Sequence, residues 1–352
     1  MISIKNKIKK NKYLSYLYLE LKIFLIKTLN SNTKRFYKEI NNRRGSSIFD
    51  YYTLAEDLPK KNNISYFDEN SYYGNDIFIT KIVSKKKRLI YYIEHGYFFG
   101  GYVVEYPLYY NDVSIITYSV RRLKHIKNKF AELLNAGDRI NVITIGPYIN
   151  YADSVLDKNE KLKIKGEHRK VLLVFPSHSI EGVIYKYDTQ DFINEIEKVS
   201  KDFDSVFVCM YWKDIQDNRH VEYENKGYKI VTAGHRNDPN FLGRLKDIID
   251  LSDMTMSNTV GTHIGYCLAR NKPHYYFDQF QKIEGKKVDE EFKERNNQEY
   301  IRTRDEEVKE VTEAFSNISY IITDEQKRVV EKYWGKNKVE YHTVEKKESH
   351  ND

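Results

Sequence analysis

Residues 254–265 read Met-Thr-Met-Ser-Asn-Thr-Val-Gly-Thr-His-Ile-Gly, and this stretch decides the fold class. The run that ends at Ser257 predicts a short strand, and a helix is expected to begin near Thr262. Between them, Gly261 permits the tight turn that joins the two elements. Because strands that lead into helices are the repeating units of α/β proteins, the flanking sequence is expected to continue the alternation.

The alternation does continue on both sides of this stretch. Apolar runs that predict strands are separated by segments with helical periodicity. We expect strands at 170–175, 205–211, 227–233, 254–257 and 274–277, and helices at 189–202, 239–251 and 262–270. Continuous apolar strands alternating with helices predict a parallel sheet that is covered on both faces.

A second alternating series lies upstream of a polar stretch, 153–169, which predicts a linker. Ser119 is expected to cap a helix that runs to about Leu134. The strands of this series are expected at 76–80, 88–93, 113–118 and 140–145. The predicted fold class is therefore α/β, with two Rossmann-like doubly wound domains that face each other across a cleft.

The length of 352 residues is enough for two such domains. Beyond residue 282 the pattern predicts a charged helix over 288–315, a strand over 318–322 and a final helix over 324–334, followed by Gly335. The organisation we expect is a basic amphipathic helical arm at 1–45, domains at 46–155 and 156–335, and a frayed tail at 336–352.

The formal net charge of +7 is concentrated near the N-terminus. Only Glu20 and Glu39 oppose the basic residues of this region, which are Lys5, Lys7, Lys9, Lys10, Lys12, Lys22, Lys27, Lys34, Arg35, Lys38, Arg43 and Arg44. Because the rest of the chain is close to neutral, no nucleic-acid partner is expected.

The apolar run in this arm is interrupted by Glu20, Lys22 and Lys27, which argues against both a signal peptide and a membrane-spanning helix. Two interpretations stay open: a helix that lies on the anionic cytoplasmic face of the inner membrane, or a helix that packs on its own protein. Cys209 and Cys267 lie in apolar runs and form no disulfide framework, which favours a cytoplasmic location.

The turn after residue 257 has the chemistry of a phosphate site. The first N–H groups of a helix are unpaired and carry the positive end of its dipole. Ser257, Thr259 and Thr262 add hydroxyl groups at this point, and the combination suits a phosphate. Ordinary capping of the helix is the alternative, since such residues cap many helices.

Two further polar loops follow predicted strands of the same sheet. Ser177, His178 and Ser179 follow the first strand, and His235 and Arg236 follow the third. Ligands of open α/β sheets bind beyond the carboxyl ends of the strands, so the three loops are expected on one rim.

In the first half, Glu94 and His95 follow a predicted strand. An imidazole can accept a proton at neutral pH, and the carboxylate can orient it or act as the base itself. Arg121 and Arg122 follow the next strand, where an arginine can hold an anionic substrate. No carboxylate pair has the spacing of a metal site, so no metal ion and no cofactor are expected.

These features together resemble the two-domain glycosyltransferases called GT-B. The likeness spans about residues 46–335. It rests on the loop 257–263, on Lys272-Pro273-His274 after the following helix, and on Glu94-His95-Gly96. The last of these is similar to a motif of teichoic-acid glycerophosphotransferases and capsule enzymes. Residues 322–335 also look like proteins of surface-polysaccharide (capsule or lipopolysaccharide) loci.

The resemblance implies that the second domain binds a nucleotide-sugar donor and the first binds a saccharide or lipid-linked acceptor. Donor contacts are then expected from Ser177, His178, Ser179, His235, Arg236, Ser257, Asn258, Thr259, Gly261, Thr262 and His263. Acceptor contacts are expected from Tyr97, Tyr118, Arg121, Arg122 and Tyr148.

The implied reaction is glycosyl transfer to a hydroxyl of a growing polysaccharide or a lipid-linked acceptor, with His95 or Glu94 as the base. The retaining members' E-x7-E motif is missing, which favours inversion, and the RxHP-type motif of the glycerophosphotransferases is missing too. Three alternatives stay open: a phosphotransferase that uses a CDP-alcohol, a nucleotide-sugar epimerase, and a non-catalytic nucleotide-binding assembly protein.

Overall fold

The structure is a computed structural model of the chain. It describes Leu21 and residues 31–59, 67–82, 90–110, 113–133, 138–180, 182–285 and 298–345. The predicted arm at 1–45 therefore lies largely outside the described residues, apart from helix α3 (Ser31–Arg44). No helix in these ranges is both long and apolar enough to cross a membrane.

The second half is built on a five-stranded parallel sheet in the order β7–β6–β4–β8–β9. Its strands are β4 (Val171–Phe175), β6 (Ser205–Cys209), β7 (Lys229–Val231), β8 (Met254–Ser257) and β9 (His274–Tyr276). β4 and β8 are buried along their whole length, because helices cover both faces of the sheet. The predicted sheet of this half is confirmed.

Two groups of helices cover this sheet. Leu172, Val174 and Met256 point to one face and pack with α8 (Thr189–Val199), α9 (Trp212–Gln216) and α10 (Val221–Asn225). Val171 and Leu173 point to the other face and pack with α11 (Phe241–Leu251) and α12 (Thr262–Ala269). Smaller elements of this half are η4 (Ser200–Asp202) and the antiparallel pair β5 (Ile184–Lys186) and β10 (Lys282–Glu284).

The first half contains a four-stranded sheet in the order β1–β2–β3–β11. β1 (Tyr91–Ile93), β2 (Ser114–Thr117) and β3 (Arg139–Thr144) are parallel, as predicted. The chain returns at its end to add β11 (Glu340–Glu345), antiparallel to β3. The predicted fold class, α/β with two Rossmann-like halves, is confirmed.

Strand β11 corrects the predicted tail over 336–345, while residues 346–352 lie outside the described residues. Along β11 only Val344 is buried, and the remaining positions are polar or exposed. An edge strand needs little apolar surface, so its sequence resembles that of a tail.

Three other segments differ from the prediction. The strand expected at 76–80 is part of helix α5 (Asn75–Ile82). The prediction was wrong because a short apolar run does not distinguish a helix from a strand. The linker expected at 153–169 contains helix α7 (Lys158–His168), which begins with a capping box. The strand expected at 318–322 is a loop in which Ile318, Tyr320 and Ile321 are exposed, with Ile321 74% exposed.

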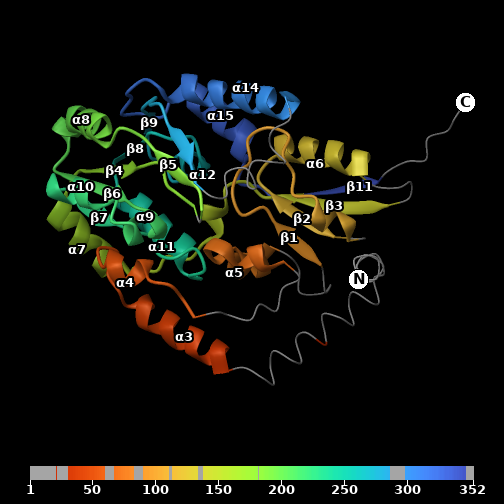
Figure 1. Cartoon of the computed structure of the whole chain (residues 1–352), viewed down its shortest axis with the longest axis horizontal. Helices are drawn as coiled ribbons and strands as arrows, with labels where there is room; N and C mark the ends of the chain where they lie inside the picture. Colours follow the sequence, from red (N-terminus) through yellow and green to blue (C-terminus); the bar gives the residue numbers. More distant parts are fainter. Residues whose placement is uncertain are drawn as a thin grey trace, which may run out of the picture.

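The two halves share one hydrophobic core. Helix α15 (Asp324–Trp334) contacts both α12 and α6 (Val120–Leu133), and α14 (Gln298–Phe315) packs on α15. Figure 1 shows α14 and α15 along the top, next to β9 of one half and α6 of the other. Trp334 is fully buried against Gly265. The C-terminal helices therefore hold the two halves together.

The segment after α3 belongs with the second half, although the prediction placed residues 46–155 in the first domain. The Ile48 carbonyl accepts a hydrogen bond from Thr232 N–H, and the Phe49 ring packs on Phe207 at 5.3 Å. Helix α4 (Tyr51–Ala55) then packs on α9. The short helices of the first half are η1 (Asp68–Gly74), η2 (Tyr106–Tyr109) and η3 (Tyr148–Tyr151).

Candidate functional site

The loops that follow β4, β6, β7 and β8 lie at one edge of the second sheet, because parallel strands end on the same side. Hydrogen bonds join neighbouring loops. Ser177 N–H donates to Asn258 Oδ1 at 2.7 Å, and the Thr232 hydroxyl donates to the Met210 carbonyl at 2.8 Å. The three loops predicted to share a rim are thus close together.

The loop 257–263 is built largely from its own polar side chains. Ser257 Oγ lies 2.9 Å from the Thr259 carbonyl and 3.0 Å from His274 Nε2. Ser257 and Asn258 are both fully buried. The structure therefore corrects the expectation that these two side chains contact a ligand: they shape the loop.

Two glutamines that the sequence analysis missed complete this loop. Gln279 accepts a hydrogen bond from the Asn258 amide at 3.0 Å, and Gln281 accepts one from the Ser177 hydroxyl at 2.8 Å. Gln281 also donates to the Asn258 carbonyl. A single glutamine in a loop carries no pattern, so no signal in the sequence marked either residue.

Helix α12 begins beside the first half. Gly261 is the N-cap of the helix and has no side chain that could accept a hydrogen bond. No capping side chain therefore binds the first N–H groups of α12. The Thr262 hydroxyl oxygen accepts a hydrogen bond from Tyr97 N–H at 2.9 Å. Because a hydroxyl can accept and donate at once, its proton remains available to a ligand.

His263 follows on the same helix and stacks on Phe175 at 5.1 Å. Burial, with a contribution from His178, lowers its pKa to about 3, so the ring is neutral at pH 7. The buried Nε2 of the ring has no hydrogen-bond partner in the described part of the chain. A neutral imidazole that donates through one nitrogen accepts through the other, which suits a ligand hydroxyl better than a phosphate.

The loop after β4 has one exposed side chain, His178, whose ring packs on Tyr211 at 4.4 Å. Desolvation by the surrounding protein lowers the pKa of His178, although the side chain is partly open to solvent. The negative charge of Asp214 opposes this shift. Its neighbour Ser179 is buried, donates from its N–H to Asp214 and accepts from Arg219 at 2.6 Å. Ser179 therefore supports the loop and is not exposed to a ligand, contrary to the prediction.

After β7, His235 and Arg236 differ in exposure. His235 is buried against Trp212 at 4.2 Å, and its Nδ1 accepts a hydrogen bond from Asn237 N–H. Burial lowers its pKa to about 4. Because the side chain is buried, the expectation of a donor contact is corrected. The guanidinium of Arg236 is half-buried and lies over the Tyr72 ring at 5.1 Å.

In the first half, Glu94 is held in a buried ion pair. Its carboxylate accepts from Arg122 at 2.5 and 3.1 Å and from the Thr117 hydroxyl at 2.5 Å. Glu94 is 1% exposed and Arg122 is 0% exposed. The predicted roles of Glu94 as a base and of Arg122 as an acceptor contact are both corrected, since neither side chain faces solvent.

Arg122 instead organises the loop that follows His95. It donates to the carbonyls of Phe98, Gly100 and Tyr102 at 2.8–3.2 Å. This arrangement leaves His95 as the candidate base of this half.

The predicted acceptor-binding tyrosines lie in the core. Tyr118 and Tyr148 are stacked at 4.0 Å, and the Tyr118 hydroxyl lies 3.1 Å from that of Tyr266. Tyr97 is buried against Trp334. These three roles are corrected for the same reason of burial, whereas Arg121 is partly exposed and pairs with Glu307 at 2.6 Å.

His95 joins a group of rings at the boundary of the two halves. Its ring lies 5.7 Å from Tyr72 and 5.5 Å from Phe98. The Tyr73 hydroxyl lies 3.4 Å from that of Tyr211. We call the following group of half-buried or exposed side chains the aromatic rim: Tyr72, Tyr73, His95, Phe98, His178, Tyr211 and Arg236.

The tyrosines of the aromatic rim escaped the sequence analysis because the chain has 31 tyrosines, so that no single one stands out. One structural signal marks Tyr73: its φ is +61°, a left-handed conformation that is costly for a side chain of this size. Its N–H donates to the Arg236 carbonyl at 2.6 Å, which holds the turn against the second half.

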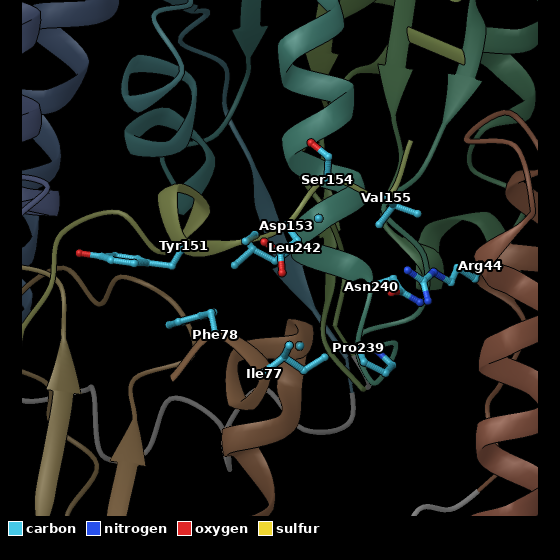
Figure 2. A pocket seen from close by; sticks show the side chains of 13 residues that line it. Arg44, Ile77, Phe78, Tyr151, Asp153, Ser154, Val155, Pro239, Asn240 and Leu242 are labelled. Atoms are coloured by element: carbon cyan, nitrogen blue, oxygen red, sulfur yellow. The ribbon is translucent and has the colours of Figure 1, made fainter. Parts of the chain in front are cut away.

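A cavity of about 190 Å³ lies where the linker passes between α5 and α11. Figure 2 shows Arg44 and Asn240 close together at one end, with Phe78 and Tyr151 at the other. None of the residues predicted for the site lines this cavity. Within the described ranges, no cluster of three or more His, Cys, Asp or Glu is placed to hold a metal ion.

No model of a known protein family matches the chain, and no curated protein matches it. Among solved structures, the chain is similar to the S. aureus MnaA-UDP co-structure, with 10% sequence identity and a TM-score of 0.37. The match covers 88% of this chain and 79% of the other. A likeness of this size carries no information about what this chain binds.

Proposed function

We propose that the chain is an enzyme that binds a nucleotide-activated sugar beside the N-terminus of α12 and transfers the sugar to an acceptor hydroxyl. One observation carries this proposal. The hydrogen bond from Tyr97 N–H to Thr262 Oγ1 brings the loop of His95 against the loop predicted to bind phosphate. A candidate base and a candidate anion site thus meet at the boundary of two α/β halves, where such folds bind ligands.

The donor diphosphate would be held by the first N–H groups of α12 and by the Thr262 hydroxyl. Arg236, which lies over the Tyr72 ring in the aromatic rim, is the candidate cation for the donor. His263 would accept a hydrogen bond from a donor hydroxyl through Nε2. These groups stabilise the negative charge that develops on the departing phosphate.

His95 would act as the general base. The acceptor oxygen forms a bond to the anomeric carbon as the bond from that carbon to the donor phosphate oxygen breaks. The proton passes to His95 and the electron pair to the leaving nucleoside diphosphate. A displacement from the opposite side inverts the anomeric carbon. The reaction as proposed uses no metal ion, and its acceptor is a saccharide or a lipid-linked saccharide of a surface polysaccharide, reached from the cytoplasm.

The first experiment is calorimetric binding of UDP, GDP, CDP, CMP and their sugar conjugates. We expect one nucleotide to bind and Thr262→Val to weaken it about tenfold or more, because a hydrogen bond to a charged group contributes about 1.5–3 kcal/mol. Thr312→Val, on the exposed face of α14, is the matched control and should bind normally. Failure of every nucleotide to bind the folded protein would contradict the proposal.

Product analysis then separates the reactions that remain. Release of a nucleoside diphosphate supports glycosyl transfer, and release of a monophosphate indicates a phosphotransferase. A changed sugar without release of nucleotide indicates an epimerase. If the protein binds nucleotide but His95→Gln keeps its full biological function, the non-catalytic role is the better account.

A further inference from the structure

We infer that the first half holds a saccharide in a second cavity, of about 280 Å³, between the loop 101–105, α6 and the start of α14. This inference rests on the proposed function, because it assigns the cavity to the acceptor. Of the side chains predicted to contact the acceptor, only Arg121 lines it. The volume is close to the lower end of ordinary ligand pockets, about 300 Å³, and matches a sugar ring rather than a long chain.

Ring contacts connect the lining of the cavity with the aromatic rim. His95 contacts Phe98 at 5.5 Å, Phe98 contacts Tyr102 at 5.5 Å, and Tyr102 contacts Tyr300 at 6.3 Å. Tyr102 and Tyr300 both line the cavity. Two ring contacts, from His95 to Phe98 and from Phe98 to Tyr102, therefore link the candidate base to the lining of the cavity.

The wall between the cavity and His95 is held firmly. Gly100 N–H donates to the buried carboxylate of Glu307 at 2.7 Å, and Arg122 binds the Gly100 carbonyl. The φ of Gly100 is +77°, and a Cβ there would come within 3.0 Å of Arg304 and Tyr300. The wall is thus fixed before a ligand arrives, which lowers the entropic cost of binding.

The charges around the cavity favour an uncharged ligand. The lining contains three basic side chains, Arg121, Lys124 and Lys129, together with His125 and three carboxylates, Glu105, Glu132 and Glu299. The carboxylates of the lining would repel a phosphate, whereas sugar hydroxyls can donate to carboxylates and accept from cations.

Some of these charges are already paired within the wall. Lys129 lies 2.8 Å from Glu105 and 3.5 Å from Glu132, and Arg121 lies 2.6 Å from Glu307. Paired groups keep lone pairs and N–H groups for further hydrogen bonds but offer little net attraction to an ion. Tyr102 and Tyr300 add flat faces on which a sugar ring can pack.

The test is saturation-transfer NMR on the full chain, with methyl glycosides of glucose, galactose, rhamnose and N-acetylglucosamine at millimolar concentration. Inorganic pyrophosphate, measured by calorimetry, is the charged probe. We expect at least one glycoside to bind and Asn128→Trp, which fills the cavity from the exposed face of α6, to reduce the signal at least about fivefold. The neighbouring Lys127→Trp, outside the cavity lining, should leave the signal unchanged.

Binding of no glycoside to the wild type, or equal binding to Asn128→Trp, would overturn the inference. So would binding of pyrophosphate that Asn128→Trp removes, because the cavity would then be an anion site. Tyr300→Ala is the second variant if Asn128→Trp does not fold, and it should weaken the same glycoside. Nucleotide binding is measured on the wild type and on each variant. A wild type that binds no nucleotide would refute the proposed function. A wild type that binds nucleotide but no glycoside would refute only this inference.

Discussion

The buried pair of Arg122 and Glu94 makes a quantitative prediction about stability. Replacement of Arg122 by Met removes both hydrogen bonds to the carboxylate and those to the carbonyls of Phe98, Gly100 and Tyr102. The aliphatic part of the side chain is kept, so the loss is mainly electrostatic. Breaking a buried ion pair on one side costs about 3–5 kcal/mol, since an uncompensated charge stays in the core.

Urea denaturation followed by circular dichroism measures this loss of unfolding free energy. Arg328→Met is the control, because Arg328 pairs with Glu325 and Glu310 on the surface and should lose less than about 1 kcal/mol. The double variant Glu94→Gln/Arg122→Met removes both charges and should be more stable than Arg122→Met alone. A loss below about 1 kcal/mol for Arg122→Met would refute the reasoning, because the pair would then behave as if it were exposed.

Three further predictions concern single positions. Gly265→Ala should destabilise the protein by about 1–3 kcal/mol in thermal melts, because its Cβ would overlap the Trp334 ring. The control is Gly166→Ala in α7, whose Cβ would meet open space and which should be neutral or stabilising. A Gly265→Ala variant as stable as the wild type would contradict the packing of Trp334 on this glycine. The pKa of His235 is lowered to about 4 in the fold, so its contribution to stability is complete above the unfolded pKa of about 6.5 and is lost as pH falls toward 4. His235→Gln should therefore reduce the dependence of the urea midpoint on pH between these values. An unchanged pH dependence in the variant would argue against this role of His235. His95→Gln should lower kcat about 10²–10⁴-fold with an unchanged melting temperature, and full activity in single-turnover assays would exclude His95 as the base.

The five parallel strands and three of the helices between 170 and 277 were predictable from the sequence, because most of the buried strands are continuous apolar runs, whereas β5, α9 and α10 were not predicted. Strand β8 and helix α15 have the predicted bounds. Prediction failed where the signal was short or polar. Strand β11 buries only Val344, and helix α5 begins with Asn75 and Asp76 before a brief apolar run that fits either structure.

For the candidate site, the sequence identified the loops but not the direction of their side chains. A loop at the end of a strand places some polar side chains toward solvent and uses others to satisfy its own backbone. Ser257, Asn258 and Ser179 belong to the second kind, and Thr262 and His178 to the first. Only the hydrogen bonds of the folded chain separate the two kinds.

The sequence by itself determined the two α/β halves, the parallel strands of the second half and the loops at the ends of these strands, because hydrophobic periodicity and turn residues act locally. Tertiary structure alone decided that Arg122 binds Glu94, that Tyr97 meets Thr262 and that Tyr73 lies beside Tyr211. Each of these pairs joins residues far apart in the chain, and long-range contacts depend on how the two halves pack rather than on any local pattern.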